Sequence, residues 1–156
     1  MNKSAHKAFT LIELLMVVAI LGVLATIPIL ALWGGTAKAR DAERRSDLKQ
    51  YQVAFETFAN SNSNYYPSRN AGAGQPPSVF CSDLGLSNCP DDPQGSISYR
   101  YQTDGSGSGA ADATSYVLWA QLEYPKTPTT WIVVCSSGQS GEATSGIPPS
   151  GGACPL

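Results

Sequence analysis

Glu13 stands out chemically because it is the only charged residue between Phe9 and Trp33. As a helix, residues 9–33 would be about 37 Å long, and a bilayer's hydrocarbon core needs about 20 residues. A carboxylate inside such a spanning helix costs roughly 2.5–3.5 kcal/mol. The stretch contains no Lys, Arg or His, so we expect no partner for Glu13 within its own helix. A new α-amino group on a neighbouring chain, formed by cleavage before Phe9, would serve as that partner.

A secretory signal peptide is another interpretation of the same segment. Its apolar region would be shorter and would end at small residues that mark a cleavage site. Here the apolar run is long and passes into a charged segment at residues 38–45 that continues the helical pattern. An uncleaved signal anchor fits these features better, but it leaves Glu13 unexplained.

Residues 7–15, Lys-Ala-Phe-Thr-Leu-Ile-Glu-Leu-Leu, resemble the class III signal of type IV pilins and of type II secretion pseudopilins. The resemblance implies that residues 1–8 are a leader removed by a prepilin peptidase. It also implies that Phe9 becomes the methylated N-terminal residue and that Glu13 attracts the amino terminus of the adjacent subunit. Ala8 departs from the family pattern, which usually has Gly before the cut.

The resemblance further implies a single-pass protein of the inner (cytoplasmic) membrane that moves into an extracellular filament on assembly. Residues 9–36 would be the transmembrane and assembly helix, in which Gly22 and Pro28 are expected to kink the helix. The partners implied are other copies of the chain, the prepilin peptidase, an assembly platform and its ATPase motor. Flanking basic residues favour the reverse orientation, so the orientation, with the leader in the cytoplasm, rests on the resemblance; these residues are Lys38, Arg40, Arg44 and Arg45.

We therefore predict a structural subunit, a pilin, of a type IV pilus-like filament. A type II secretion pseudopilin is an alternative, because the same N-terminus serves both. Two possible disulfides and a Gly/Ser-rich tail favour the surface fibre. A monomeric signal-anchored surface domain that binds a ligand is a third hypothesis, and it leaves Glu13 without a role.

The predicted fold is α+β, with a long N-terminal helix packed on a small antiparallel sheet, as in pilins. The helix should run from Phe9 to about Asn60, and residues 37–60 form its amphipathic half within a soluble unit of residues 37–156. One apolar face is predicted from helical spacing, formed by Leu48, Tyr51, Phe55 and Phe58. Polar residues should occupy the other faces, namely Arg44, Arg45, Lys49, Gln52 and Glu56.

Residues 61–156 should contain loops, a meander sheet and a disulfide-bounded tail. Residues 65–94 are rich in proline and are predicted to be a loop. Three strands are expected from alternation and β-branched residues, at residues 96–102, 115–123 and 130–135, with turns at 104–113 and 125–128. The tail, 136–156, is too rich in Gly, Ser and Pro to hold itself together.

The four cysteines predict two disulfides in an exported chain, because their spacing suits zinc poorly. We expect Cys81 to bond Cys89 within the proline-rich loop and Cys135 to bond Cys154, which would tie down the tail. Cys81–Cys135 with Cys89–Cys154, and the crossed form of that pairing, remain open.

Catalysis is not expected. The only histidine, His6, lies in the predicted leader, which excludes Ser-His-Asp and Cys-His mechanisms from the mature chain. No cofactor is predicted. Calcium has a weak basis in a resemblance to secretion pseudopilins, with oxygen ligands from Asp91, Asp92, Asp104 and Asp112, although solvated turn acids are a commoner explanation. The net charge of −2 gives no basic field for nucleic acid.

Overall fold

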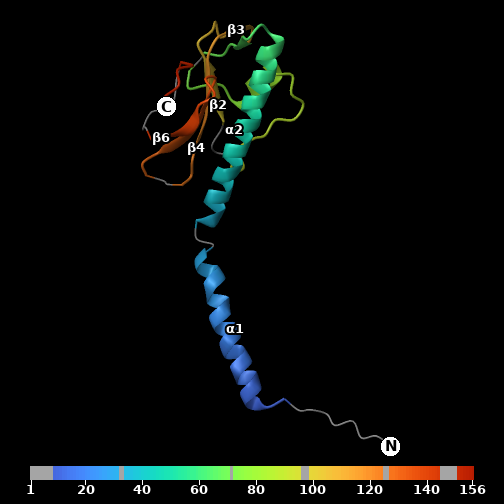
Figure 1. Cartoon of the computed structure of the whole chain (residues 1–156), viewed down its shortest axis with the longest axis vertical. Helices are drawn as coiled ribbons and strands as arrows, with labels where there is room; N and C mark the ends of the chain where they lie inside the picture. Colours follow the sequence, from blue (N-terminus) through green and yellow to red (C-terminus); the bar gives the residue numbers. More distant parts are fainter. Residues whose placement is uncertain (1–8, 32–33, 71, 96–98, 125–126, 145–150) are drawn as a thin grey trace, which may run out of the picture. The chain divides into compact units, whose positions relative to one another are not determined.

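The computed structural model describes residues 9–31, 34–70, 72–95, 99–124, 127–144 and 151–156, and for residues 26–31 it describes the backbone alone. The chain forms two units, residues 1–36 and residues 37–156. Figure 1 shows the helices and strands of both units, coloured along the sequence.

Two helices, rather than one, make up the N-terminal part of the chain. Helix α1 spans Leu11–Ala31 and helix α2 spans Gly35–Ser61, so the predicted continuous helix from Phe9 to about Asn60 is wrong. Gly34 has φ 81°, a left-handed conformation that glycine adopts readily and that does not propagate an α-helix. Over the described residues, no helix has the length and apolar character needed to cross a membrane; the transmembrane helix at residues 9–36 stays a prediction.

One face of α2 packs into the hydrophobic core of the second unit. Leu48, Tyr51 and Phe55 are fully or almost fully buried, as the helical spacing predicted, and Phe58 is half-buried. Arg44 is a correction, because its side chain is completely buried instead of lying on a solvent face. Arg44 lies on the same face as Leu48, one turn earlier in the helix. The buried face of α2 therefore extends past its apolar residues to a charged one.

The main sheet is an antiparallel meander, as predicted. Its strands are β2 (Arg100–Thr103), β4 (Tyr116–Gln121), β5 (Thr130–Cys135) and β6 (Ser140–Thr144), in the order β2-β4-β5-β6. Alternation along β4 sends Tyr116, Leu118 and Ala120 into the core shared with α2, while Val117 and Trp119 join a second apolar cluster. The sheet therefore has two covered faces, and the α+β class is confirmed.

Four of the described elements were missed from the sequence. Helix α3 (Pro77–Asp83) lies in the predicted proline-rich loop and begins with proline at its first position, where the missing N–H costs nothing; its Phe80 is fully buried. Strands β1 (Tyr66–Pro67) and β3 (Ala111–Ala113) form a separate two-stranded sheet. Strand β6 lies in the tail, for which no strand was predicted; pairing with β5 supplies its backbone partners.

Candidate assembly site

Helix α1 exposes apolar side chains around its whole circumference. The five consecutive residues from Leu14 to Val18 are each at least 50% exposed, and successive residues are about 100° apart around an α-helix. Other exposed apolar residues extend this surface, including Phe9, Leu11, Ile12, Ile20, Leu21, Val23 and Leu24. A helix that is apolar on all sides belongs in a core or a membrane rather than against one neighbouring surface.

Glu13 is held at the beginning of α1 by Thr10. The Glu13 Oε2 atom accepts hydrogen bonds from the Thr10 backbone N–H (3.0 Å) and from Thr10 Oγ1 (2.8 Å). In return, Thr10 Oγ1 accepts one from the Glu13 N–H (3.4 Å). This reciprocal Thr-x-x-Glu arrangement is a capping box. Glu13 therefore has a hydrogen-bond partner beside its own helix, while a cationic partner from a neighbouring chain stays a prediction.

The predicted kink positions both lie inside α1. Gly22 and Pro28 belong to a single helix from Leu11 to Ala31, so the helix is not unwound at either position. A kink at these residues stays a prediction. Ala8, on the leader side of the predicted cut, lies outside the described residues, while Phe9 is 80% exposed.

A buried ionic cluster centred on Arg44 lies where α2 meets two loops. Arg44 Nε and Nη2 donate to the two carboxylate oxygens of Asp92 at 2.6 and 2.9 Å. Arg44 Nη1 lies 2.7 Å from Asp41 Oδ1 and 2.7 Å from Glu123 Oε1. The Asp41 carboxylate also accepts the backbone N–H groups of Glu123 and Tyr124, both at 2.9 Å. These contacts join α2, the loop before β2 and the segment that follows β4.

Contacts within the cluster favour the ionised forms of Glu123 and Arg44. Hydrogen bonds from Arg40 and, after it, from Arg44 lower the pKa of Glu123 to about 2 against the opposing effect of burial. Burial alone would lower the pKa of Arg44, but bonds to Asp92, Glu123 and Asp41 raise it. The cluster was missed because Asp92 and Glu123 lie far from α2 in the sequence and share no pattern with it. The spacing of Arg44 from Leu48 was the sequence signal that placed Arg44 on the buried face.

The structure contains two disulfides, Cys81–Cys89 and Cys135–Cys154. The first joins α3 to the loop that leads to Asp92, and Cys81 is itself part of the core. The second joins the end of β5 to the C-terminal segment. Together they account for all four cysteines.

The aspartates considered for calcium are engaged elsewhere. Asp92 binds Arg44, and Asp104 accepts hydrogen bonds from the backbone N–H groups of Thr114 and Ser115. In the part of the chain that the structure describes, no three acidic, histidine or cysteine side chains gather in a way that could hold a metal ion.

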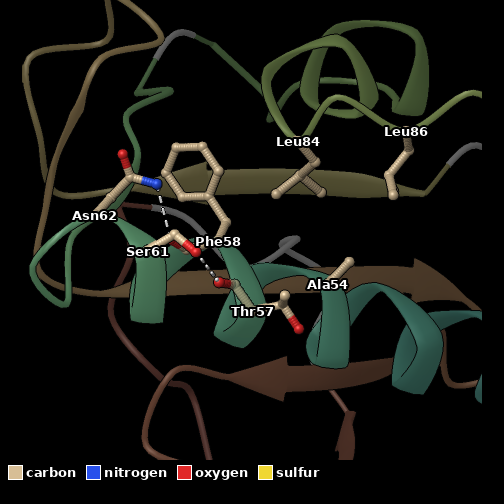
Figure 2. Close-up of a pocket in the computed structure, with 7 residues that line it drawn as sticks. All are labelled: Ala54, Thr57, Phe58, Ser61, Asn62, Leu84 and Leu86. Carbon is tan, nitrogen blue, oxygen red and sulfur yellow. Dashed lines mark hydrogen bonds between the residues drawn. The ribbon is translucent and has the colours of Figure 1, made fainter.

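Two grooves flank α2. The larger, of about 350 Å³, lies between the last turns of α2 and the loop after α3, and Figure 2 shows Phe58, Leu84 and Leu86 among its lining residues. A smaller groove of about 230 Å³ lies between α2 and the β5–β6 edge, with Arg45 and Lys49 beside Ile132. Among the lining residues that the structure describes, neither groove shows a hydroxyl or thiol nucleophile hydrogen-bonded to a base.

Helix α1 is apolar, has a carboxylate in its capping box and precedes an α+β unit. This is the arrangement expected of a subunit with an N-terminal assembly helix. Residues 3–27 match the family model of the prokaryotic N-terminal methylation motif. The chain is also 33% identical over 72 residues to the Type II secretion system core protein G of Aeromonas hydrophila. That match covers 46% of this chain and 50% of the relative, so the chain spans about half the relative's length. No solved structure matches the chain significantly. Both matches agree with the resemblance of the N-terminal residues to type IV pilins and type II secretion pseudopilins.

Proposed function

We propose that this chain is cleaved between Ala8 and Phe9, methylated at Phe9, and assembled through α1 into an extracellular filament of the type IV pilus kind. The observation that carries the proposal is the apolar circumference of α1, which is exposed at every position from Leu11 to Leu24 and carries Glu13 as its lone charge. Several neighbouring helices are needed to cover such a surface, and a helical filament of identical subunits supplies them.

Glu13 is suited to set the register of that assembly. Its carboxylate is turned toward the N-terminal end of α1 by Thr10, which is the end at which cleavage would create a charged α-amino group. In the filament, the α-amino group of an adjacent copy would bind the Glu13 carboxylate alongside Thr10. A polar contact inside an apolar interface has its best-attested role in fixing register.

The remaining machinery follows from the same proposal. Before assembly the chain would be held in the inner (cytoplasmic) membrane by residues 9–36, with Gly22 and Pro28 allowing the helix to bend. A prepilin peptidase would cut it, and an assembly platform with an ATPase motor would add it to the fibre. The chain itself would act by association and not by catalysis.

A pseudopilin of a type II secretion system is the second candidate. It is favoured by the relative from Aeromonas hydrophila, whose name assigns it to such a system. The matched part of that relative covers less than half of this chain. Both candidates use the same cleavage, the same helix and the same role for Glu13.

The mass of the mature N-terminus tests the proposal. Intact mass and N-terminal peptide analysis of the native protein should give a chain that begins at N-methylated Phe9. A chain that keeps Met1, or one cut near Ala31, would overturn the proposal and favour a signal-anchored monomer or a cleaved signal peptide. Deleting the protein then separates the two candidates: loss of surface fibres supports the pilus, and loss of secreted enzymes with fibres intact supports the pseudopilin.

A further inference from the structure

The two edges of the main sheet differ in how their backbone groups are used. At the β2 edge, Tyr101 exchanges two backbone hydrogen bonds with Gln75, at 2.7 and 3.0 Å. Further along the same edge, Thr103 donates its N–H to the Arg69 carbonyl at 2.8 Å. At the other edge, β6 pairs with β5 on one side, and no described segment pairs with its outer side. The β6 edge is therefore open in the part of the chain that the structure describes.

Alternate residues of β6 direct their backbone groups outward. Cys135 of β5 donates its N–H to the Gln139 carbonyl at 2.9 Å. Because the direction of backbone groups alternates along an antiparallel pair, every second residue from Gln139 bonds β5. The N–H and C=O groups of the residues between them face away from β5, and these residues are Ser140, Glu142 and Thr144. An extended peptide could bond these groups and become an additional strand.

Strand β6 lacks several features that protect an exposed sheet edge from such pairing. Proteins commonly block an edge with proline, lysine or a β-bulge. The sequence of β6, Ser-Gly-Glu-Ala-Thr, contains neither proline nor lysine, and its register with β5 is regular along its length. Its one charged residue, Glu142, pairs with Arg45 of α2. That charge is therefore directed toward α2 and does not guard the edge.

The groove between α2 and the β5–β6 edge defines the side-chain chemistry of a partner. Its volume is about 230 Å³, and Ile132, Val134 and Ser140 are among its lining residues. Ser140 pairs with Val134, which belongs to the core shared with α2. The Ser140 side chain is therefore on the α2 side of the sheet. A residue across from Ser140 on an added strand would project over the same groove.

Lys49 places an unpaired positive charge at that groove. Its side chain is exposed and lines the groove, and it forms no ion pair with a described residue. Arg45, one turn earlier on α2, is already paired with Glu142. Opposite charges on neighbouring elements stabilise strand pairing, so the groove favours a carboxylate on a strand that is otherwise apolar or β-branched.

We propose that β6 accepts an extended segment of another protein as an additional strand, with an Asp or Glu side chain across from Ser140 and beside Lys49. Backbone hydrogen bonds would give the affinity, and Lys49 would select the acidic side chain. A second copy of this chain fits less well. Its β2 edge is occupied, and the one carboxylate of its β6, Glu142, is already bound to Arg45.

The experiment uses the full chain in detergent micelles and the acetylated, amidated peptide Thr-Val-Asp-Val-Thr-Val, with empty micelles as the blank. At saturating peptide, hydrogen exchange of the Ser140, Glu142 and Thr144 amides should slow by at least about tenfold. A control peptide is N-methylated at Asp and at the following Val. It keeps the charge but loses a hydrogen-bond donor to β6 in either strand direction, so it should leave these exchange rates unchanged.

Selection of the acidic side chain is tested with Lys49→Gln. The matched control is Lys38→Gln, which removes another exposed lysine of α2. Relative to a peptide with Asn in place of Asp, the Asp peptide should lose about two- to fivefold in affinity for Lys49→Gln and nothing for Lys38→Gln.

Three results would overturn the proposal: unchanged exchange in β6 at the highest soluble peptide concentration, equal binding of the N-methylated peptide, or equal effects of the two lysine variants. Dimerisation of the chain that protects the same β6 amides without peptide would also overturn it, in favour of a second copy as the occupant.

Discussion

Thr10 and Glu13 hydrogen-bond to each other across the first turn of α1, with the Thr10 N–H 3.0 Å from Glu13 Oε2 and the Glu13 N–H 3.4 Å from Thr10 Oγ1. The carboxylate expected to act between subunits therefore also has a task within its own subunit. It caps the helix that would assemble, and its position is set before any neighbour arrives.

Replacing Glu13 by Val should stop or strongly slow fibre formation while the chain still enters the membrane. The substitution removes the carboxylate that would receive the neighbour's α-amino group, but it makes the segment more apolar. Membrane fractionation and electron microscopy of surface fibres measure the two effects separately. Thr10→Val is the matched control, because it removes the capping hydroxyl and keeps the carboxylate. Undiminished fibres from Glu13→Val would exclude the register role.

Replacing Arg44 by Met should destabilise the globular unit by roughly 3–5 kcal/mol, since Asp41 and Asp92 would be left buried without their cation. Arg45→Met is the control. Arg45 pairs with Glu142 at a half-exposed position, and such surface pairs contribute about 0–1 kcal/mol. Urea unfolding followed by tryptophan fluorescence compares the two. Equal losses of stability would show that the Arg44 cluster is no stronger than a surface pair.

Lowering the pH should reduce the unfolding free energy of the globular unit, because Glu123 becomes protonated. Its pKa of about 2 in the folded chain lies below the ordinary value of 4.5, so its contribution to stability is complete above about pH 4.5. That contribution should fall as the pH is lowered from 4.5 to about 2, where the folded carboxylate takes up its proton. In Glu123→Gln, the unfolding free energy at neutral pH should be lower and its dependence on pH in this window shallower. An identical acid profile in Glu123→Gln would assign the sensitivity to other groups.

Replacing Phe55 by Ala should cost about 3–5 kcal/mol, the usual loss for a buried aromatic residue. Phe55 is fully buried and stacks on Tyr101 with ring centroids 4.2 Å apart. Val53→Ala, two residues earlier on an exposed part of α2, should change the unfolding free energy by less than about 0.5 kcal/mol. A small effect of Phe55→Ala would mean that the aromatic core can repack around the cavity.

Local patterns in the sequence determined the helical character of α1 and α2, the strands β2, β4 and β5, and the N-terminal motif. The apolar run with Glu13, the three-and-four spacing of Leu48, Tyr51 and Phe55, and the β-branched run at residues 130–135 each lie within one continuous segment of the sequence. Periodicity in such short windows reports which face is buried, so these features could be predicted without knowing what they pack against.

Contacts between distant segments decided the rest. Arg44 is buried because Asp92 and Glu123, 48 and 79 positions away, meet it in space. Strand β6, with the weak sequence Ser-Gly-Glu-Ala-Thr, exists because β5 offers it an edge. Cys154, in the C-terminal segment, packs against the sheet because its disulfide with Cys135 holds it there. Burial of a charge and pairing of a poor strand are favourable only when particular partners are brought together, and that depends on the tertiary structure.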